Sequence, residues 1–312
     1  MMKKNERIHK IKKAKALTRQ DVESKKLRIL FIGIGTMGYP MCLNLHKAGY
    51  KVEAFNRTYD KALGLKRQGI KVLKHLPNQL DYDIILSTVS DDKASENVFW
   101  GKYQVLKKMK ANTIVLECST LSPDYILQLN EAVKKKASIL LDAPVSGSLP
   151  EANDGTLLFL AGGDTSVVEA IEPMLLTMGK QVYRMGEVGN GMEMKLANNI
   201  LNGVQMLILG EVLLFVEACK IDFNLFADIV SNGQPGSPII KAKLQRLKEK
   251  MDSPVQAKIS IIKKDLLYAE QIAKKHGLPL MLTSTAANIF GIAEKNGHGD
   301  EDVSNASMNY KK

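Results

Sequence analysis

The clearest chemistry in this sequence of 312 residues comes from three glycines at fixed spacing. Gly33, Gly35 and Gly38 form the pattern G-x-G-x-x-G. In such a pattern the first glycine allows a tight turn, the second lets the backbone approach a pyrophosphate, and the third lets a helix lie close to a strand. Free N–H groups at the start of that helix would hold the phosphates, and we expect Thr36 and Met37 to contribute there.

This turn needs a strand before it and a helix after it. Leu27 to Ile32 is an apolar run suited to a buried parallel strand, and Val52 to Phe55 predicts a second strand beyond the helix. A glycine-rich turn that binds nothing is the alternative, and this order of elements argues against it. The sequence therefore predicts a dinucleotide-binding unit.

The end of the second predicted strand indicates which dinucleotide is bound. Many NAD-binding chains carry an acidic residue there, about 20 residues past the first glycine, which binds the ribose 2′-OH. This chain has Asn56, Arg57 and Thr58 instead. Arg57 could pair with a 2′-phosphate, whereas a carboxylate would repel it. We therefore expect NADP(H) to be preferred, with NAD(H) as the alternative cofactor.

Two further predicted strands end in polar loops. Asp81 to Val89 leads into an acidic loop, and Thr113 to Cys118 leads into Ser119 and Thr120. Ligands of doubly wound sheets collect at the carboxyl ends of such strands. We expect Val89, Ser119 and Thr120 to line the nicotinamide side of the site. The alternative is a helix cap, a role that Ser119, Thr120 and Ser122 before Pro123 also suit.

The motifs resemble those of the β-hydroxyacid dehydrogenases. This family includes 3-hydroxyisobutyrate dehydrogenase, 6-phosphogluconate dehydrogenase and glyoxylate/succinic semialdehyde reductase. The matching strings are G-I-G-T-M-G-Y-P-M-C-L-N-L-H-K-A-G, L-D-A-P-V-S-G-S and G-N-G-M-E-M-K-L-A-N-N, and the resemblance runs from about Leu27 to Met308. It implies an α/β fold: an N-terminal Rossmann domain with a doubly wound parallel sheet, and an all-helical C-terminal domain joined to it by a long helix.

The second string resembles the substrate-binding motif of the family. The resemblance implies that Ser146, Gly147 and Ser148, together with Thr120, hold the substrate carboxylate. Most members read S-G-G at this point. The S-G-S of this chain is more like the glyoxylate/succinic semialdehyde reductases, so we expect a small carboxylate-bearing aldehyde or hydroxy acid as substrate.

The third string resembles the helix that carries the catalytic acid/base of the family. Lys195 matches the catalytic lysine, and Asn199 matches the asparagine beside it. Positions four apart share one face of a helix, which suits a joint role on a carbonyl oxygen. A later K-D-L string implies that Lys264 reaches the cofactor and that Asp265 supports the active site. Burial or the neighbouring Lys264 would have to lower the pKa of Lys195.

Charge sets off the N-terminus of the chain, and the family resemblance implies the division of the rest into two domains. Residues 1–26 form a basic extension with ten basic and three acidic residues, which supplies most of the net charge of +11. We expect this extension to be solvated rather than to bind nucleic acid. Residues 27–188 form the predicted NADP-binding domain, and residues 189–312 form the predicted helical domain. The apolar run from Ile200 to Cys219 is interrupted by polar residues and predicts a buried core helix rather than a membrane span.

Cysteine and histidine usage limits the other chemistries. Three widely spaced cysteines indicate neither a disulfide framework nor a zinc cluster, and they favour a reducing cytoplasm. Five histidines without metal-ligand spacing predict no metal site. We also expect a homodimer or homotetramer.

The sequence therefore predicts an NADP(H)-dependent oxidoreductase that interconverts a small hydroxy acid and its aldehyde or semialdehyde. One alternative is an NAD-dependent 3-hydroxyisobutyrate-type dehydrogenase. Another is a non-catalytic scaffold that keeps the fold and uses its basic tail on nucleic acid. A third is an imine reductase on the same fold. Lys195 argues against the last two, because a scaffold would have lost this lysine and imine reductases often replace it.

Overall fold

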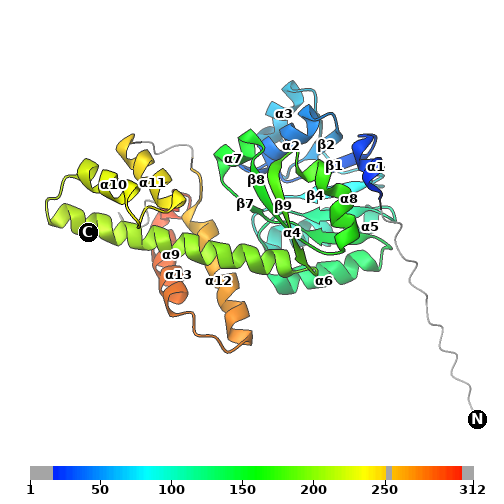
Figure 1. Ribbon diagram of the computed structural model, residues 1–312. Helices are drawn as coiled ribbons and strands as arrows, with labels where there is room; N and C mark the ends of the chain where they lie inside the picture. The colour runs from blue at the N-terminus through cyan, green and yellow to red at the C-terminus, as the bar shows by residue number, and fades with distance from the viewer. Residues whose placement is uncertain (1–16, 251–254, 304–312) are drawn as a thin grey trace, which may run out of the picture. The chain divides into compact units, whose positions relative to one another are not determined.

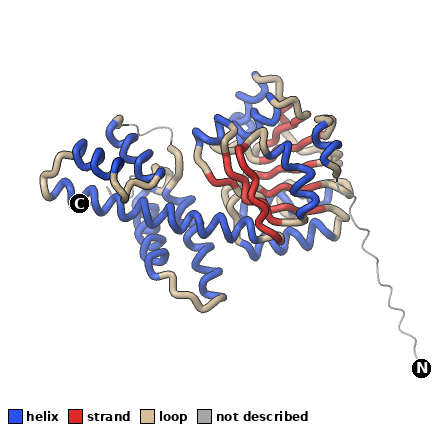
Figure 2. The backbone as a smooth tube through the Cα atoms, viewed as in Figure 1, coloured by secondary structure: helices blue, strands red, loops and turns tan. Residues whose placement is uncertain are grey.

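The computed structural model describes residues 17–250 and 255–303, and it contains two compact units (Figure 1). The first unit ends at Met192 and the second begins at Glu193. Strands occur only in the first unit among the described residues (Figure 2).

The first unit is built on one sheet whose first six strands are parallel, in the order β3-β2-β1-β4-β5-β6. Parallel strands have to be connected by crossovers, and helices lie between most of these strands. These strands are β1 (Arg28–Ile32), β2 (Lys51–Phe55), β3 (Lys71–Leu73), β4 (Ile84–Ser87), β5 (Ile114–Glu117) and β6 (Ile139–Asp142).

The last three strands do not all continue the parallel arrangement of the first six. β8 (Leu157–Gly162) runs antiparallel to β6 and to β7 (Val145–Ser146), and β9 (Gly179–Gly186) is parallel to β8. β6 ends at Asp142, two residues before Pro144, which cannot donate to a strand ladder. The chain then returns through β7 and one short helix, so β8 takes the opposite direction.

Helices cover both faces of the sheet, which confirms the doubly wound fold. Alternate residues of β1 show this, because Ile29 and Phe31 belong to one apolar core while Leu30 and Ile32 belong to the other. The helices of this unit are α1 (Arg19–Glu23), α2 (Gly38–Lys47), η1 (Tyr59–Ala62), α3 (Leu63–Arg67), α4 (Asp92–Phe99), α5 (Val105–Lys108), α6 (Pro123–Lys134), α7 (Leu149–Asp154) and α8 (Thr165–Leu175).

Part of the predicted solvated extension is folded. A capping box between Thr18 and Asp21 starts α1, and α1 packs against α8. Val22 is fully buried in the core, and the Lys25 ammonium donates to the carbonyl of Ala48 at 2.6 Å. The prediction of a solvated segment is therefore wrong for Val22, while residues 1–16 lie outside the described residues.

A buried carboxylate fixes the start of the long helix α9 (Asn190–Ala218). Asp142, at the end of β6, accepts hydrogen bonds from the backbone N–H groups of Gly189 at 2.8 Å and Met192 at 2.9 Å. A negative group at a helix N-terminus accepts hydrogen bonds from the free N–H groups and interacts favourably with the positive end of the helix dipole. Burial raises the pKa of Asp142 to about 6, against the opposing effect of these hydrogen bonds.

The second unit is helical throughout its described part. Its core gathers apolar side chains from α9, α10 (Phe223–Asn232), α11 (Pro238–Lys248), α12 (Ile259–Lys275) and α13 (Met281–Ala293), which continues into the π-helix η2 (Glu294–His298). Pro238 opens α11 after the loop that the Gly and Pro content predicts.

By length and composition alone, α9 could also cross a membrane. Leu207 and Leu209 lie in the core of the second unit, whereas Leu201 and Phe215 are each 65% exposed. The predicted buried helix is therefore correct for one face only.

Candidate active site

Two of the three motif glycines are required by the packing of the chain itself. Gly33 has a φ of +95°, and a β-carbon there would lie 2.0 Å from the carbonyl oxygen of Thr88. A β-carbon on Gly38 would lie 2.0 Å from the carbonyl oxygen of Gly33. The Thr88 hydroxyl donates to that Gly33 carbonyl at 2.6 Å. The residue directly after β4 therefore holds the glycine turn in place.

Gly35 differs from the other two because its missing β-carbon faces open space, with no atom of the described residues within 4 Å apart from its chain neighbours. Thr36 beside it is exposed, and Met37 is half-buried. The helix α2 begins at Gly38, and no side chain caps it within the described part of the chain. Free N–H donors and a glycine with room above it are what a pyrophosphate needs, so these residues fit a bound dinucleotide.

Two residues after β2 have different surroundings: Asn56 is hydrogen-bonded to the glycine turn, and Arg57 is an exposed cation. The Asn56 side chain accepts from the backbone N–H of Ile34 at 3.0 Å and donates to the carbonyl of Thr58 at 2.7 Å. Asn56 therefore holds the glycine turn against the end of β2. Arg57 and Thr58 are exposed at that same end, so the Arg57 guanidinium can reach a ligand lying across the carboxyl ends of β1 and β2.

The loops after β4 and β5 are tied together by Ser119. Its hydroxyl accepts from the backbone N–H of Val89 at 2.7 Å and donates to the carboxyl group of Glu117. Of the three residues named as possible helix caps, Ser122 caps α6. Thr120 is half-buried beside Ser119. Sequence reasoning missed Glu117, because a single acid at the end of an apolar strand carries no signal of its own.

The S-G-S turn is held by a residue that sequence reasoning also missed. The backbone N–H and the hydroxyl of Ser148 both donate to one carboxylate oxygen of Glu151, each at 2.8 Å. This is a capping box that starts α7, and the S-x-x-E spacing could have revealed it. The hydroxyl hydrogen of Ser148 is thus used within the protein, while Gly147 has a φ of +131° and Ser146 is half-buried.

The predicted catalytic residues meet a buried carboxylate in the second unit. The Asn199 amide, on α9, donates to Asp265 Oδ2 at 2.6 Å, and both residues are almost fully buried. The Lys264 ammonium lies 3.0 Å from Asp265 Oδ1. Burial lowers the pKa of Lys195, Asp265 opposes that effect and Lys264 adds to it. The structure thus brings these four residues together.

Tyr268 belongs to the same cluster and was not predicted. Its ring lies one helical turn beyond Lys264, whose ammonium sits 5.0 Å from the ring centroid. A cation over an aromatic face is attracted by the ring quadrupole. Asn198 donates to the side-chain carbonyl of Asn199 at 3.2 Å, which fixes the orientation of that amide.

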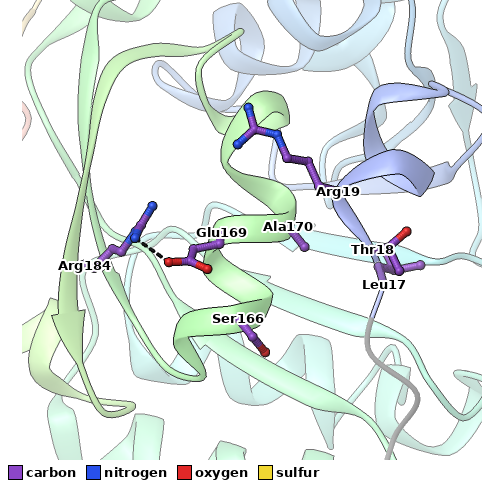
Figure 3. A pocket seen from close by; sticks show the side chains of 7 residues that line it. All are labelled: Leu17, Thr18, Arg19, Ser166, Glu169, Ala170 and Arg184. Atoms are coloured by element: carbon purple, nitrogen blue, oxygen red, sulfur yellow. Dashed lines mark hydrogen bonds and ion pairs between the residues drawn. The ribbon is translucent and has the colours of Figure 1, made fainter.

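A shallow depression between α1 and α8 holds none of the predicted site residues (Figure 3). Both of its arginines are paired, Arg184 with Glu169 at 2.6 Å and Glu172 at 2.8 Å, and Arg19 with Glu23 at 2.8 Å. We assign no ligand to it. Its lining consists of Leu17, Thr18, Arg19, Ser166, Glu169, Ala170 and Arg184.

Comparison with known proteins matches both parts of this arrangement. Residues 28–186 match the family model of the NAD binding domain of 6-phosphogluconate dehydrogenase. Residues 189–309 match the model described as NAD-binding of NADP-dependent 3-hydroxyisobutyrate dehydrogenase. Together with the glycine turn, these matches define an oxidoreductase that acts on CH–OH groups with NAD(P).

Individual relatives narrow the class further. The chain is 32% identical to 2-(hydroxymethyl)glutarate dehydrogenase of Eubacterium barkeri, over 90% of this chain and 93% of that protein. It is 30% identical to glyoxylate/succinic semialdehyde reductase 1 of Arabidopsis thaliana, over 89% of this chain and 96% of that protein. The crystal structure of 3-hydroxyisobutyrate dehydrogenase from Salmonella typhimurium shares the fold, with a TM-score of 0.83 and 24% identity over 91% of this chain and all of that one. The chain belongs to the 3-hydroxyisobutyrate dehydrogenase-like family of β-hydroxyacid dehydrogenases.

Proposed function

We propose that this protein is an NADP(H)-preferring reductase that converts a small aldehyde acid to its hydroxy acid, with glyoxylate or succinic semialdehyde as favoured substrate. The observation that carries the proposal is the cluster of Lys195, Asn199, Lys264 and Asp265. It gathers a lysine of lowered pKa, an oriented amide and a second cation around one buried carboxylate.

Lys195 acts on the proton of the substrate oxygen. The bound nicotinamide supplies the hydride in reduction and accepts it in oxidation. In reduction the Lys195 ammonium donates a proton to the developing alkoxide, and in oxidation the neutral amine takes the hydroxyl proton. A lowered pKa makes the neutral amine more accessible than it is in an ordinary lysine. One N–H of the Asn199 amide bonds Asp265, and we assign the other to the substrate oxygen.

Arg57 supports the preference for NADP(H). It is exposed at the carboxyl end of β2, and no carboxylate occupies positions 56–58. A guanidinium suits a phosphate through two parallel hydrogen bonds. Gly35, Thr36 and Met37 would hold the pyrophosphate from the start of α2.

In this proposal the S-G-S turn and Thr120 bind the substrate carboxylate. Because Ser148 is engaged by Glu151, we assign the direct contacts to Ser146, the backbone of Gly147 and Thr120. The S-G-S wording supports the glyoxylate/succinic semialdehyde branch, while the Eubacterium relative keeps hydroxymethyl diacids among the candidates.

The test is a substrate panel with both cofactors. Purified protein is assayed with glyoxylate, succinic semialdehyde, 3-hydroxyisobutyrate and 2-(hydroxymethyl)glutarate, each with the NADP and NAD forms. We expect the highest kcat/KM for glyoxylate or succinic semialdehyde with NADPH. A higher value for 3-hydroxyisobutyrate with NAD would favour the dehydrogenase alternative, and NADPH binding without turnover on any substrate would favour the scaffold alternative.

We further propose that the protein is a homodimer or homotetramer in a reducing cytoplasm. Several large apolar side chains of the second unit are at least 57% exposed, which is surface that a partner copy could cover. Sedimentation equilibrium measures the mass directly, and a monomer at micromolar concentration would contradict this part. The residues are Leu201, Phe215, Leu225, Ile229, Leu278, Met281, Leu282 and Ile292.

A further inference from the structure

Glu117 is a fully buried acid at the carboxyl end of β5, close to the predicted cofactor residues. It accepts from the backbone N–H of Ser119 at 3.0 Å and from the Ser119 hydroxyl. The Ser95 hydroxyl donates to its other oxygen at 3.2 Å. No lysine or arginine forms an ion pair with it anywhere in residues 17–250 and 255–303. A buried acid without a cation is costly, so its retention calls for a role.

The bonds to Glu117 determine what Ser119 can do. A serine hydroxyl has a single hydrogen, and Glu117 takes it. The lone pairs of the Ser119 oxygen are then free to accept from the backbone N–H of Val89 at 2.7 Å. In this way one buried carboxyl group joins the loop after β5 to the loop after β4.

The loop after β4 also reaches the glycine turn. Thr88, next to Val89, donates its hydroxyl to the Gly33 carbonyl at 2.6 Å and its backbone N–H to the Ile32 carbonyl at 2.8 Å. A continuous chain of contacts therefore runs from the buried acid through Ser119 and the end of β4 to the turn. The glycine turn has separate anchors of its own, since Asn56 also holds Ile34.

We infer that Glu117 is a positioning residue that fixes the nicotinamide-side loops, formed by Val89 and Ser119, relative to the glycine turn. It touches neither substrate nor cofactor and acts through the Ser119 hydroxyl. The inference rests on the proposed placement of the cofactor. It predicts that loss of Glu117 weakens the contribution of the nicotinamide to binding and leaves the adenosine and phosphate contributions in place.

The electrostatics of Glu117 suggest a conservative variant. Burial raises its pKa to about 7, while the hydrogen bonds from Ser119 and Ser95 oppose that shift. The group is therefore uncharged in a large share of molecules at neutral pH. A glutamine is also uncharged, and its carbonyl oxygen can accept both bonds from Ser119.

The experiment compares two ligands on the same variants. Dissociation constants are measured by calorimetry for NADPH and for 2′-phospho-ADP-ribose, which lacks the nicotinamide. The dissociation constant of 2′-phospho-ADP-ribose divided by that of NADPH gives a ratio that reports the nicotinamide contribution alone. Should the protein prefer NAD(H), the same ratio is taken with NADH and ADP-ribose, so the cofactor preference and this inference fail separately.

We expect Glu117→Ala to reduce this ratio by about tenfold, the effect of losing one good hydrogen-bond anchor. Glu117→Gln should stay within about twofold of wild type. Ser95→Ala removes another partner of the acid without touching Ser119 and serves as the matched control, with an unchanged ratio. Should Glu117→Ala not fold, Ser119→Ala breaks the same link and should reduce the ratio equally.

Two results would overturn the inference. One is a wild-type ratio in Glu117→Ala or in Ser119→Ala, because the nicotinamide-side loops would then not depend on the link. The other is a Glu117→Gln variant that loses the ratio as fully as Glu117→Ala, because hydrogen-bond acceptance would then not be the function of this side chain.

Discussion

The glycine turn of the first unit and the lysine cluster of the second unit are built in opposite ways. The turn consists of backbone, with Gly35 leaving room and no side chain capping the start of α2 among the described residues. The cluster consists of side chains, with Lys195, Lys264 and Asn199 arranged around Asp265. Phosphates need several fixed donors at once, which backbone supplies, whereas proton transfer needs a group whose pKa can be set by its surroundings.

The largest expected effect follows from removing the acid/base. Lys195→Ala should reduce turnover by about 10² to 10⁴, the usual contribution of a positioned general acid. NADPH affinity should be unchanged, because the assigned phosphate contacts lie in the first unit. Turnover and NADPH fluorescence titration are measured together, with Lys274→Ala as a control that removes an exposed lysine of α12. More than about a tenth of wild-type turnover would contradict the role of Lys195.

Arg57→Asp should produce the reverse pattern. It removes a charge-assisted pair and adds a repulsion, so NADPH affinity should fall by about 10²-fold, whereas NADH affinity should change little. Turnover at saturating cofactor should be retained. Calorimetry with both cofactors decides the matter, and equal NADPH affinity in wild type and variant would remove Arg57 from the cofactor site.

Two alanine substitutions separate the roles of the motif glycines. Gly38→Ala places a methyl group against the Gly33 carbonyl and should lower the free energy of unfolding by about 1–3 kcal/mol. Gly35→Ala enters open space, so the free energy of unfolding should be unchanged while NADPH binding weakens by a similar amount, about tenfold or more. Urea unfolding and cofactor titration of both variants give the comparison. Equal loss of stability in the two would refute the assignment of Gly35 to the ligand.

The pH dependence sharpens the description of the cluster. Burial and then Lys264 lower the pKa of Lys195, so Lys264→Ala should raise that pKa toward its ordinary value. The ammonium donates the proton in reduction and exists below its pKa, so the reductive rate falls as pH rises through it. In the variant this fall should move to higher pH at saturating NADPH. Lys263→Ala, which removes the neighbour paired with Glu294, is the control, and a profile that does not move would exclude Lys264 as a cause.

The smallest effect concerns the N-terminus. Deletion of residues 2–16 removes no predicted site residue, so turnover and the urea midpoint should both stay at wild-type values. Deletion of residues 2–26 also removes Val22 from the core and should destabilise the protein by about 2 kcal/mol. Activity and unfolding assays on both truncations test this, and a change in turnover with the shorter deletion would link the tail to the active site.

The success of sequence reasoning depended on how local each feature is. The glycine turn and the strands beside it follow from neighbouring residues, so pattern alone predicted them. Asp142 accepts a hydrogen bond from Gly189, 47 residues later in the chain, and Asn199 donates one to Asp265, 66 residues later. Such pairs exist only after folding, which is why the lysine cluster needed a family resemblance and the cap of α9 was not predicted.

Other misses were visible in the sequence but were interpreted in one way only. The capping role of Ser148 was not predicted, although Glu151 three residues later is the usual partner of a capping serine. The antiparallel pairing of β8 with β6 and β7 was not predicted either. Val22 was counted within a charged segment, where one apolar residue between polar neighbours gives no clear signal.

The sheet ends in two strands whose outer hydrogen-bonding groups could in principle recruit another chain. One is β3, which is only three residues long and carries Lys71, paired with Glu53 at 3.1 Å. The other is β9, which exposes Lys180 and Arg184. Short length and exposed cations on edge strands discourage edge-to-edge pairing, because joining two copies would set lysine against lysine. Protection of this kind keeps the edges of the sheet from pairing with other strands, so the proposed association of copies would have to use the exposed apolar helices of the second unit.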